Sequence, residues 1–244
     1  MPRVAVMAST TIELETSDGA MPLYESVPDH EPGRAVIVVQ EAFGVNAHIE
    51  SICDRLAAEG YRAVGPHVFH RSGGGTAPYD DFSKVMPHFE RLTDDAFVVD
   101  IGTTIRYLND LGFDDRSIGT VGFCMGGRVT FLESIEFSLG AAVGFYGGGI
   151  VEGRFPQFPA LIDRVPEMST PWLGLFGDQD GSIPIDQVER LRVALVDAPV
   201  ECEVVRYADA DHGFNCDARP SYEPACAADA WSRTLAWFQR HLSD

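Results

Sequence analysis

The feature that most constrains the fold of this chain is the glycine-rich run Gly122-Phe123-Cys124-Met125-Gly126-Gly127. The apolar stretch 117–121 before it reads as a buried strand, and residues 128–132 after it can open a helix. A sharp strand-to-helix turn strains the backbone at its apex, and flanking glycines let neighbouring backbone come close. The run therefore indicates a nucleophile elbow with Cys124 where a serine is usual. Taken alone, it fits a buried structural cysteine equally well.

Strands and helices are predicted to alternate over most of the chain. Apolar runs predict strands at 35–39, 61–64, 141–146, 172–176 and 202–207. Helical spacing of apolar residues predicts helices at 49–57, between Thr93 and Gly112, at 188–195 and at 227–242. Unbroken apolar strands are typical of a parallel sheet covered on both faces. This pattern indicates an α/β fold with a mostly parallel, doubly wound sheet.

The segments 11–16 and 20–25 alternate around Asp18-Gly19, which predicts an antiparallel hairpin at one edge of that sheet. At 244 residues and without a linker-like stretch, the chain is expected to form a single domain over residues 1–244. The net charge of -19 argues against nucleic acid or an anionic membrane as partner.

The five cysteines are odd in number and show no paired spacing, which favours neither a disulfide framework nor a zinc ribbon and suggests a reducing cytoplasm. The apolar stretch within Met1–Ser9 is too short for a signal peptide, and no later stretch reaches the ~20 apolar residues of a membrane span.

A base and an acid for the Cys124 thiol follow two other predicted strands. His212 lies in the loop after the strand 202–207, at the sheet edge where catalytic groups gather in open parallel sheets. Of the two acids after the preceding strand, Asp180 is favoured as the group that orients the histidine, and Asp178 as a turn former. The order Cys124, Asp180, His212 is that of α/β-hydrolases, and the three signals together predict a catalytic triad.

Acyl transfer also needs donors for a developing oxyanion. The backbone N–H groups of Met125, after the nucleophile, and of Ala42, in the loop after the strand 35–39, are the predicted pair. Glu41 lies beside them. Its carboxylate would raise the pKa of the thiol by like-charge repulsion, and a hydrogen bond from the thiol could keep the thiol protonated until substrate binds. The alternative is a solvated loop glutamate without a role at the site.

These motifs together resemble the dienelactone hydrolase family of cysteine α/β-hydrolases. The resemblance spans nearly the whole chain and rests on the motifs at 40–46, 122–128, 144–147, 180–184 and 212–214. It implies Cys124 as nucleophile, His212 as base, Asp180 as its orienting acid and Glu41 as partner of the resting thiol. Tyr146 matches a family tyrosine near the site and is expected to line the substrate pocket, although packing in the core explains it equally well.

Two departures from the family concern the substrate. Namesake members resemble one another in clamping a substrate carboxylate with arginines, one of them soon after the catalytic histidine. This chain has Asn215-Cys216-Asp217 there, and Arg219 is only an approximate substitute. Acidic Asp211 and Asp217 would further disfavour an anionic ligand.

The second departure is Pro66-His67-Val68-Phe69-His70, where the family resembles P-D-L-Y. His67 and His70 could suggest a metal pair, but no third ligand is evident, so neither a metal nor a cofactor is predicted. Aromatic residues of the stretch 71–91, Phe89 among them, and Phe43 are expected to line the substrate pocket, with core packing as the alternative.

The sequence thus predicts a hydrolase of small esters or lactones that acts through an acyl-enzyme on Cys124. A redox or sensing protein with a reactive Cys124 thiol is the alternative, and its weakness is the absence of an obvious resolving cysteine. A hydrolase scaffold used only for binding would have no need of Asp180 behind His212.

Overall fold

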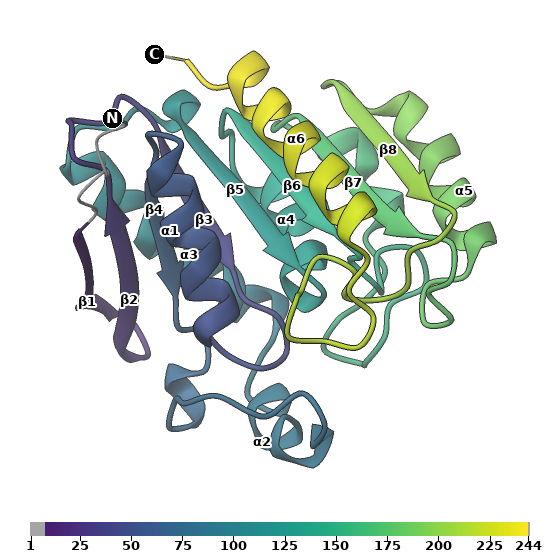
Figure 1. Cartoon of the computed structure of the whole chain (residues 1–244), viewed down its shortest axis with the longest axis horizontal. Helices are drawn as coiled ribbons and strands as arrows, with labels where there is room; N and C mark the ends of the chain where they lie inside the picture. Colours follow the sequence, from purple (N-terminus) through teal and green to yellow (C-terminus); the bar gives the residue numbers. More distant parts are fainter. Residues whose placement is uncertain (1–7, 244) are drawn as a thin grey trace.

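The computed structural model of this chain describes residues 8–243. The stretch 1–7, which entered the signal-peptide prediction, lies outside the described residues, as does Asp244. Eight strands form one sheet in the order β1-β2-β4-β3-β5-β6-β7-β8 (Figure 1). The strands are β1 Ala8–Thr16, β2 Gly19–Val27, β3 Ala35–Val39, β4 Arg62–Pro66, β5 Ile118–Phe123, β6 Ala141–Phe145, β7 Trp172–Gly177 and β8 Cys202–Tyr207.

The sheet has the predicted mixed topology. β1 pairs antiparallel with β2, and β2 pairs antiparallel with β4, whereas every later pairing is parallel. The hairpin turns at Asp18-Gly19, where Gly19 has a φ of 114° that favours glycine. The predicted α/β class and the N-terminal hairpin are therefore confirmed.

The helices cover both faces of the sheet. They are α1 Ala47–Ala58, α2 Met86–Phe89, α3 Asp94–Asp110, α4 Met125–Glu136, α5 Ile185–Ala194 and α6 Pro224–His241. α1 and α6 lie in front of the sheet, while α4 lies behind it with α3 packed beside it (Figure 1). The Thr93 hydroxyl accepts a hydrogen bond from Ala96 N and caps α3. None of the helices in the described residues is both long and apolar enough to cross a membrane.

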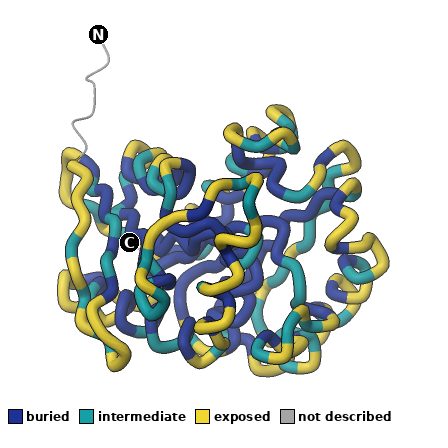
Figure 2. The backbone as a smooth tube through the Cα atoms, turned by 90° about the horizontal axis from the view of Figure 1, so that it is seen from below, coloured by how far each residue is buried: buried dark blue, intermediate teal, exposed yellow. Residues whose placement is uncertain are grey.

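The core lies along the middle strands. All residues of β3, β5, β6 and β7 are buried, and exposed residues concentrate in the outer loops and helix faces (Figure 2). Helices on both faces explain why these strands are apolar throughout.

The stretch 71–91, for which no strand or helix was predicted, contains short helical turns. It lies within a series of short helical turns made by η1 His70–Ser72, η2 Phe82–Lys84 and α2. Asp81 caps η2 through its side chain, and Pro87 stands within the first turn of α2, both of which favour a helical start. These turns form a separate lobe below the sheet in Figure 1.

The parallel strands bring four loops to one edge of the sheet. β3, β5, β7 and β8 all run in the same direction, so the segments that follow them meet at their carboxyl ends.

Candidate active site

Cys124 occupies a strained turn between β5 and α4. Its φ of 55° and ψ of -111° place it in a region that side chains rarely adopt. A Cβ on Gly122 would lie 2.1 Å from the carbonyl oxygen of Gly126, and a Cβ on Gly126 would lie 2.3 Å from that of Val39. Only glycine permits these approaches, which pack the elbow against the end of β3 and present the Cys124 thiol to a cavity.

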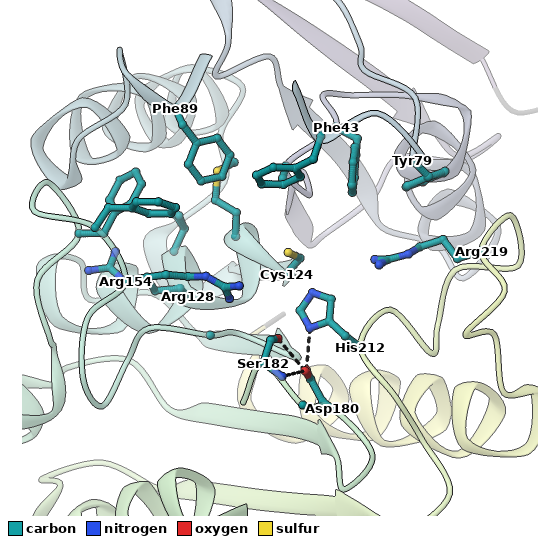
Figure 3. Close-up of a pocket in the computed structure, with 18 of the residues that line it drawn as sticks. Phe43, Tyr79, Phe89, Cys124, Arg128, Arg154, Asp180, Ser182, His212 and Arg219 are labelled. Atoms are coloured by element: carbon teal, nitrogen blue, oxygen red, sulfur yellow. Dashed lines mark hydrogen bonds and ion pairs between the residues drawn. The ribbon is translucent and has the colours of Figure 1, made fainter. Parts of the chain in front are cut away.

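His212 and Asp180 lie beside this thiol. His212 Nδ1 donates a hydrogen bond of 2.6 Å to Asp180 Oδ2, and the other edge of the imidazole faces Cys124 (Figure 3). Asp180 is only 4% exposed. Its second oxygen accepts hydrogen bonds from the Ser182 backbone at 2.8 Å and hydroxyl at 2.6 Å. The structure therefore brings the three predicted triad residues together.

The two ionisable partners shift each other's proton affinity. Burial lowers the pKa of His212, but the Cys124 thiolate and the Asp180 carboxylate outweigh it and raise the pKa to about 10. Burial raises the pKa of Asp180, but hydrogen bonds from His212 and Ser182 reverse this and bring it below its usual range. The site therefore favours a positively charged imidazole ring at His212, held by a charged Asp180.

The two predicted oxyanion donors, Met125 and Ala42, lie at the same cavity. Met125 begins α4 and Ala42 follows β3, and both line the cavity that holds Cys124. Among the described residues, neither N–H group donates a hydrogen bond. Both are therefore available to a ligand in the cavity, as the prediction requires.

Glu41 does not form the predicted contact with the thiol in this structure. Its carboxylate is fully buried, and its Oε1 lies 3.4 Å from Nη1 of Arg219. Its Oε2 has no hydrogen-bond partner in the described residues. Burial raises the pKa of Glu41, against the opposing effect of Arg219 and His212. The partner of Glu41 is therefore the guanidinium of Arg219, which carries the opposite charge.

Of the predicted pocket residues, Phe43 and Phe89 line the cavity and Tyr146 does not. Tyr146 is fully buried behind the imidazole, with its ring centre 5.1 Å from that of His212. It shares with Cys124 a positive φ, here 38°, because it follows the neighbouring strand β6 into a tight turn. Its position in the core corrects the prediction that it lines the pocket.

The cavity has a volume of about 470 Å³. Several residues that line the cavity were not among the predicted pocket residues, namely Phe97, Arg128, Arg154, Phe155, Phe158 and Ser182. The loop between β6 and β7, which supplies three of them, has no periodic pattern that would reveal which side chains face inward. The Asp180-Gly181-Ser182 spacing was a usable signal, because an aspartate often bonds the backbone two residues on.

Asp178 lies in a turn, as predicted, but its side chain pairs with an arginine of another strand. Its two oxygens accept hydrogen bonds of 2.7 and 2.8 Å from Arg206 on the neighbouring strand β8. Asp178 and Asp180 therefore face different sides of one loop, and Asp180 alone of the two lines the cavity.

The two histidines of the second departure differ in their contacts, because the buried Nε2 of His67 has no hydrogen-bond partner among the described residues, whereas His70 is paired. His70 Nε2 lies 3.1 Å from Asp100 Oδ1, and Arg71 also pairs with Asp100. Within residues 8–243, one group could offer three metal ligands, namely His48, Cys216 and Asp217, whose ligand atoms lie within 4.8 Å of one another.

Comparison with known proteins gives a consistent result. The sequence pattern of the dienelactone hydrolase family matches residues 21–242. A "putative carboxymethylenebutenolidase" of Escherichia coli is 37% identical over 245 residues, covering 98% of this chain and 89% of that protein. The carboxymethylenebutenolidase of Pseudomonas putida is 29% identical over 212 residues, covering 85% of this chain and 86% of that protein.

Solved structures agree at the level of the fold. The crystal structure of a "putative dienelactone hydrolase" from Klebsiella pneumoniae superimposes with a TM-score of 0.89 at 36% identity. It covers 97% of this chain and 100% of that chain. The α/β architecture and its strand order are therefore shared with a chain of the same extent.

Proposed function

This chain belongs to the dienelactone hydrolase family, and from that premise we propose that it hydrolyses small esters or lactones through Cys124, His212 and Asp180. The observation that carries the proposal is the 2.6 Å hydrogen bond between His212 and Asp180 beside a thiol held in a strained turn. A structural cysteine would need neither the strain nor the charged neighbour.

In the first half of the reaction, the Cys124 thiolate attacks the carbonyl carbon of the ester. The carbonyl oxygen becomes an oxyanion, which the N–H groups of Met125 and Ala42 stabilise. The carbon–oxygen bond to the alcohol then breaks, and the leaving oxygen takes the proton from His212 Nε2. An acyl-enzyme thioester remains on Cys124.

In the second half, His212 accepts a proton from water as the water oxygen attacks the thioester carbon. The carbon–sulfur bond breaks, the acid leaves, and the thiolate and imidazolium are restored. Asp180 keeps Nδ1 protonated throughout, so Nε2 is the nitrogen that carries protons to and from the substrate. With a lactone, acid and alcohol leave as one molecule.

Substitution of the nucleophile tests this proposal. We expect Cys124→Ala to lower kcat/KM for methyl phenylacetate by at least about 10³-fold, with Cys226→Ala, a half-buried thiol outside the cavity, as matched control. Acid quenching of the wild-type reaction should trap the acyl mass on Cys124 in a peptide digest.

Retained turnover in Cys124→Ala would remove the thiol from the mechanism. Reversible oxidation of Cys124 in a protein that hydrolyses no ester would instead favour the redox-thiol alternative.

A further inference from the structure

One wall of the cavity is a continuous series of aromatic rings. Beginning beside the triad, the ring of Phe43 contacts Tyr79 edge to face, with centroids 4.7 Å apart, and Phe82, with centroids 6.5 Å apart. Phe82 in turn lies 6.1 Å from Phe89, and Phe89 lies 5.7 Å from Phe155. Three separate segments of the chain thus contribute to one aromatic surface.

The loop between β6 and β7 completes this surface. Phe158 packs edge to face against Phe89 at 6.0 Å and lies 6.0 Å from Phe97 of α3. Gln157 Nε2 donates a hydrogen bond of 3.3 Å to the carbonyl oxygen of Phe89, which ties the loop to the lobe that holds α2. Six phenylalanines line the cavity, and we call them the aromatic wall: Phe43, Phe82, Phe89, Phe97, Phe155 and Phe158.

The cavity is larger than a small acyl group needs. An apolar cavity of about 150 Å³ already holds a benzene ring, and this one is about 470 Å³. Phe82 at its rim is 49% exposed, so a bound apolar group that covered its ring would remove apolar surface from water, which is favourable. Edge-to-face packing on such rings favours a planar aromatic partner over an alkyl chain.

Charge in the cavity is largely balanced. Arg128 holds Asp94 through two hydrogen bonds of 2.6 and 3.0 Å, and Arg219 is paired with the buried Glu41. Arg154 is exposed and has no acidic partner among the described residues, while Asp211 offers an opposite charge at the same cavity. The cavity therefore favours neither an anionic nor a cationic ligand.

We propose that the aromatic wall binds an uncharged aryl group of one or two rings, carried by the ester next to the bond that is cleaved. The reaction itself rests on the function proposed above, whereas the binding of the aryl group does not. The cavity joins the wall to Cys124 and His212, so an ester with its carbonyl at the thiol can place its ring on the wall.

A panel of methyl esters tests this. It compares methyl acetate, methyl cyclohexylacetate, methyl phenylacetate, methyl 2-naphthylacetate and methyl 4-carboxyphenylacetate, each kcat/KM being divided by the rate constant of hydroxide-catalysed hydrolysis. We expect the phenyl and naphthyl esters to exceed methyl acetate by about ten- to a hundredfold, with the cyclohexyl ester between. Equal values for acetate and phenylacetate, or a preference for the carboxylated ester, would overturn the proposal.

Variants of the wall locate the preference. Phe82→Ala and Phe155→Ala should each reduce the ratio of the phenylacetate to the acetate value by about three- to tenfold. Phe137→Ala, which removes a half-buried ring outside the cavity, should leave that ratio unchanged. An unaltered ratio in both wall variants would contradict the assignment.

A binding measurement separates this inference from the proposed reaction. Calorimetric titration of the Cys124→Ala protein with 2-naphthylacetamide should give a Kd at least tenfold lower than with acetamide. If the wild type hydrolyses no ester yet shows this difference, the proposed function fails and the aryl site stands. If ester hydrolysis depends on Cys124 and the two amides bind alike, the function stands and the aryl site fails.

Discussion

Two buried carboxyl groups in this protein have opposite surroundings. Asp180, in the loop after β7, is 4% exposed and accepts hydrogen bonds from His212 and twice from Ser182. Glu133, on α4 behind the sheet, is 2% exposed, and neither of its oxygens has a hydrogen-bond partner within the described chain. Burial disfavours the charged form of both, and partners reverse that effect only at Asp180.

Hydrogen-bond partners, more than the extent of burial, therefore decide which buried carboxyl group is charged. The pKa of Asp180 lies below its usual range, whereas burial raises the pKa of Glu133 to about 8. Glu41 is intermediate, because one of its oxygens is paired with Arg219 and the other is not. A conservative carboxyl-to-amide change should therefore act differently at each of the three.

The largest effect is expected at the partnered acid. Asp180→Asn replaces the acceptor of the His212 Nδ1 proton with a neutral amide, which favours the wrong tautomer and removes the charge that supports the imidazolium. We expect kcat/KM for methyl phenylacetate to fall by roughly 10³–10⁴-fold.

Asp178→Asn is the matched control, because Asp178 lies in the same loop but pairs with Arg206 outside the cavity. It should change kcat/KM by less than about threefold. Equal losses in both variants would mean that the loop fold, and not the His212 contact, is responsible.

A smaller effect, on stability, is expected at the unpartnered acid. The folded-state pKa of Glu133, about 8, exceeds the ordinary value of 4.5, so folded protein keeps a proton that the unfolded chain releases. The free energy of unfolding of the wild type therefore falls as pH rises from about 4.5 to about 8. Glu133→Gln should lose this dependence. Between pH 5 and pH 8, its free energy of unfolding should therefore rise by roughly 3 kcal/mol relative to that of the wild type.

Urea unfolding at pH 5 and pH 8 measures this difference. Glu136→Gln changes a more exposed glutamate of the same helix, paired with Arg164, and serves as the control. A wild-type pH dependence that persists unchanged in Glu133→Gln would show that Glu133 is not the titrating group.

The smallest effect is expected at Glu41. Glu41→Gln keeps the shape but removes a negative charge near Cys124 and releases the charge of Arg219, and both changes favour the thiolate. We expect the rate of Cys124 alkylation by iodoacetamide at pH 7 to rise about three- to tenfold, measured by mass spectrometry with the exposed Glu152→Gln as control. Slower alkylation would indicate that Glu41 acts as a base toward the thiol.

Much of the fold could be predicted because its signals are local. The unbroken apolar run 35–39 and the Asp18-Gly19 turn encode a buried parallel strand and a hairpin in a few adjacent residues. The short helical turns of 71–91 were not predicted, because elements of three or four residues are too short to show a helical period.

The order of Cys124, Asp180 and His212 could be predicted for a similar reason. Each follows a strand, and parallel strands deliver their carboxyl ends to one edge of the sheet. The roles of Tyr146 and Asp178 could not, because whether a side chain after a strand turns toward the cavity, the core or a neighbouring strand depends on residues distant in sequence.

By itself, then, the sequence determined the α/β sheet, the glycine elbow and the order of the candidate catalytic residues, since periodicity and turn chemistry act over a few residues. The pairing of residues shows up in the tertiary structure alone: Glu41 is paired with Arg219, Glu133 has no hydrogen-bond partner in the described chain, and rings from four segments meet in the aromatic wall. Partners and packing are properties of groups far apart in the chain, and folding alone brings them within contact distance.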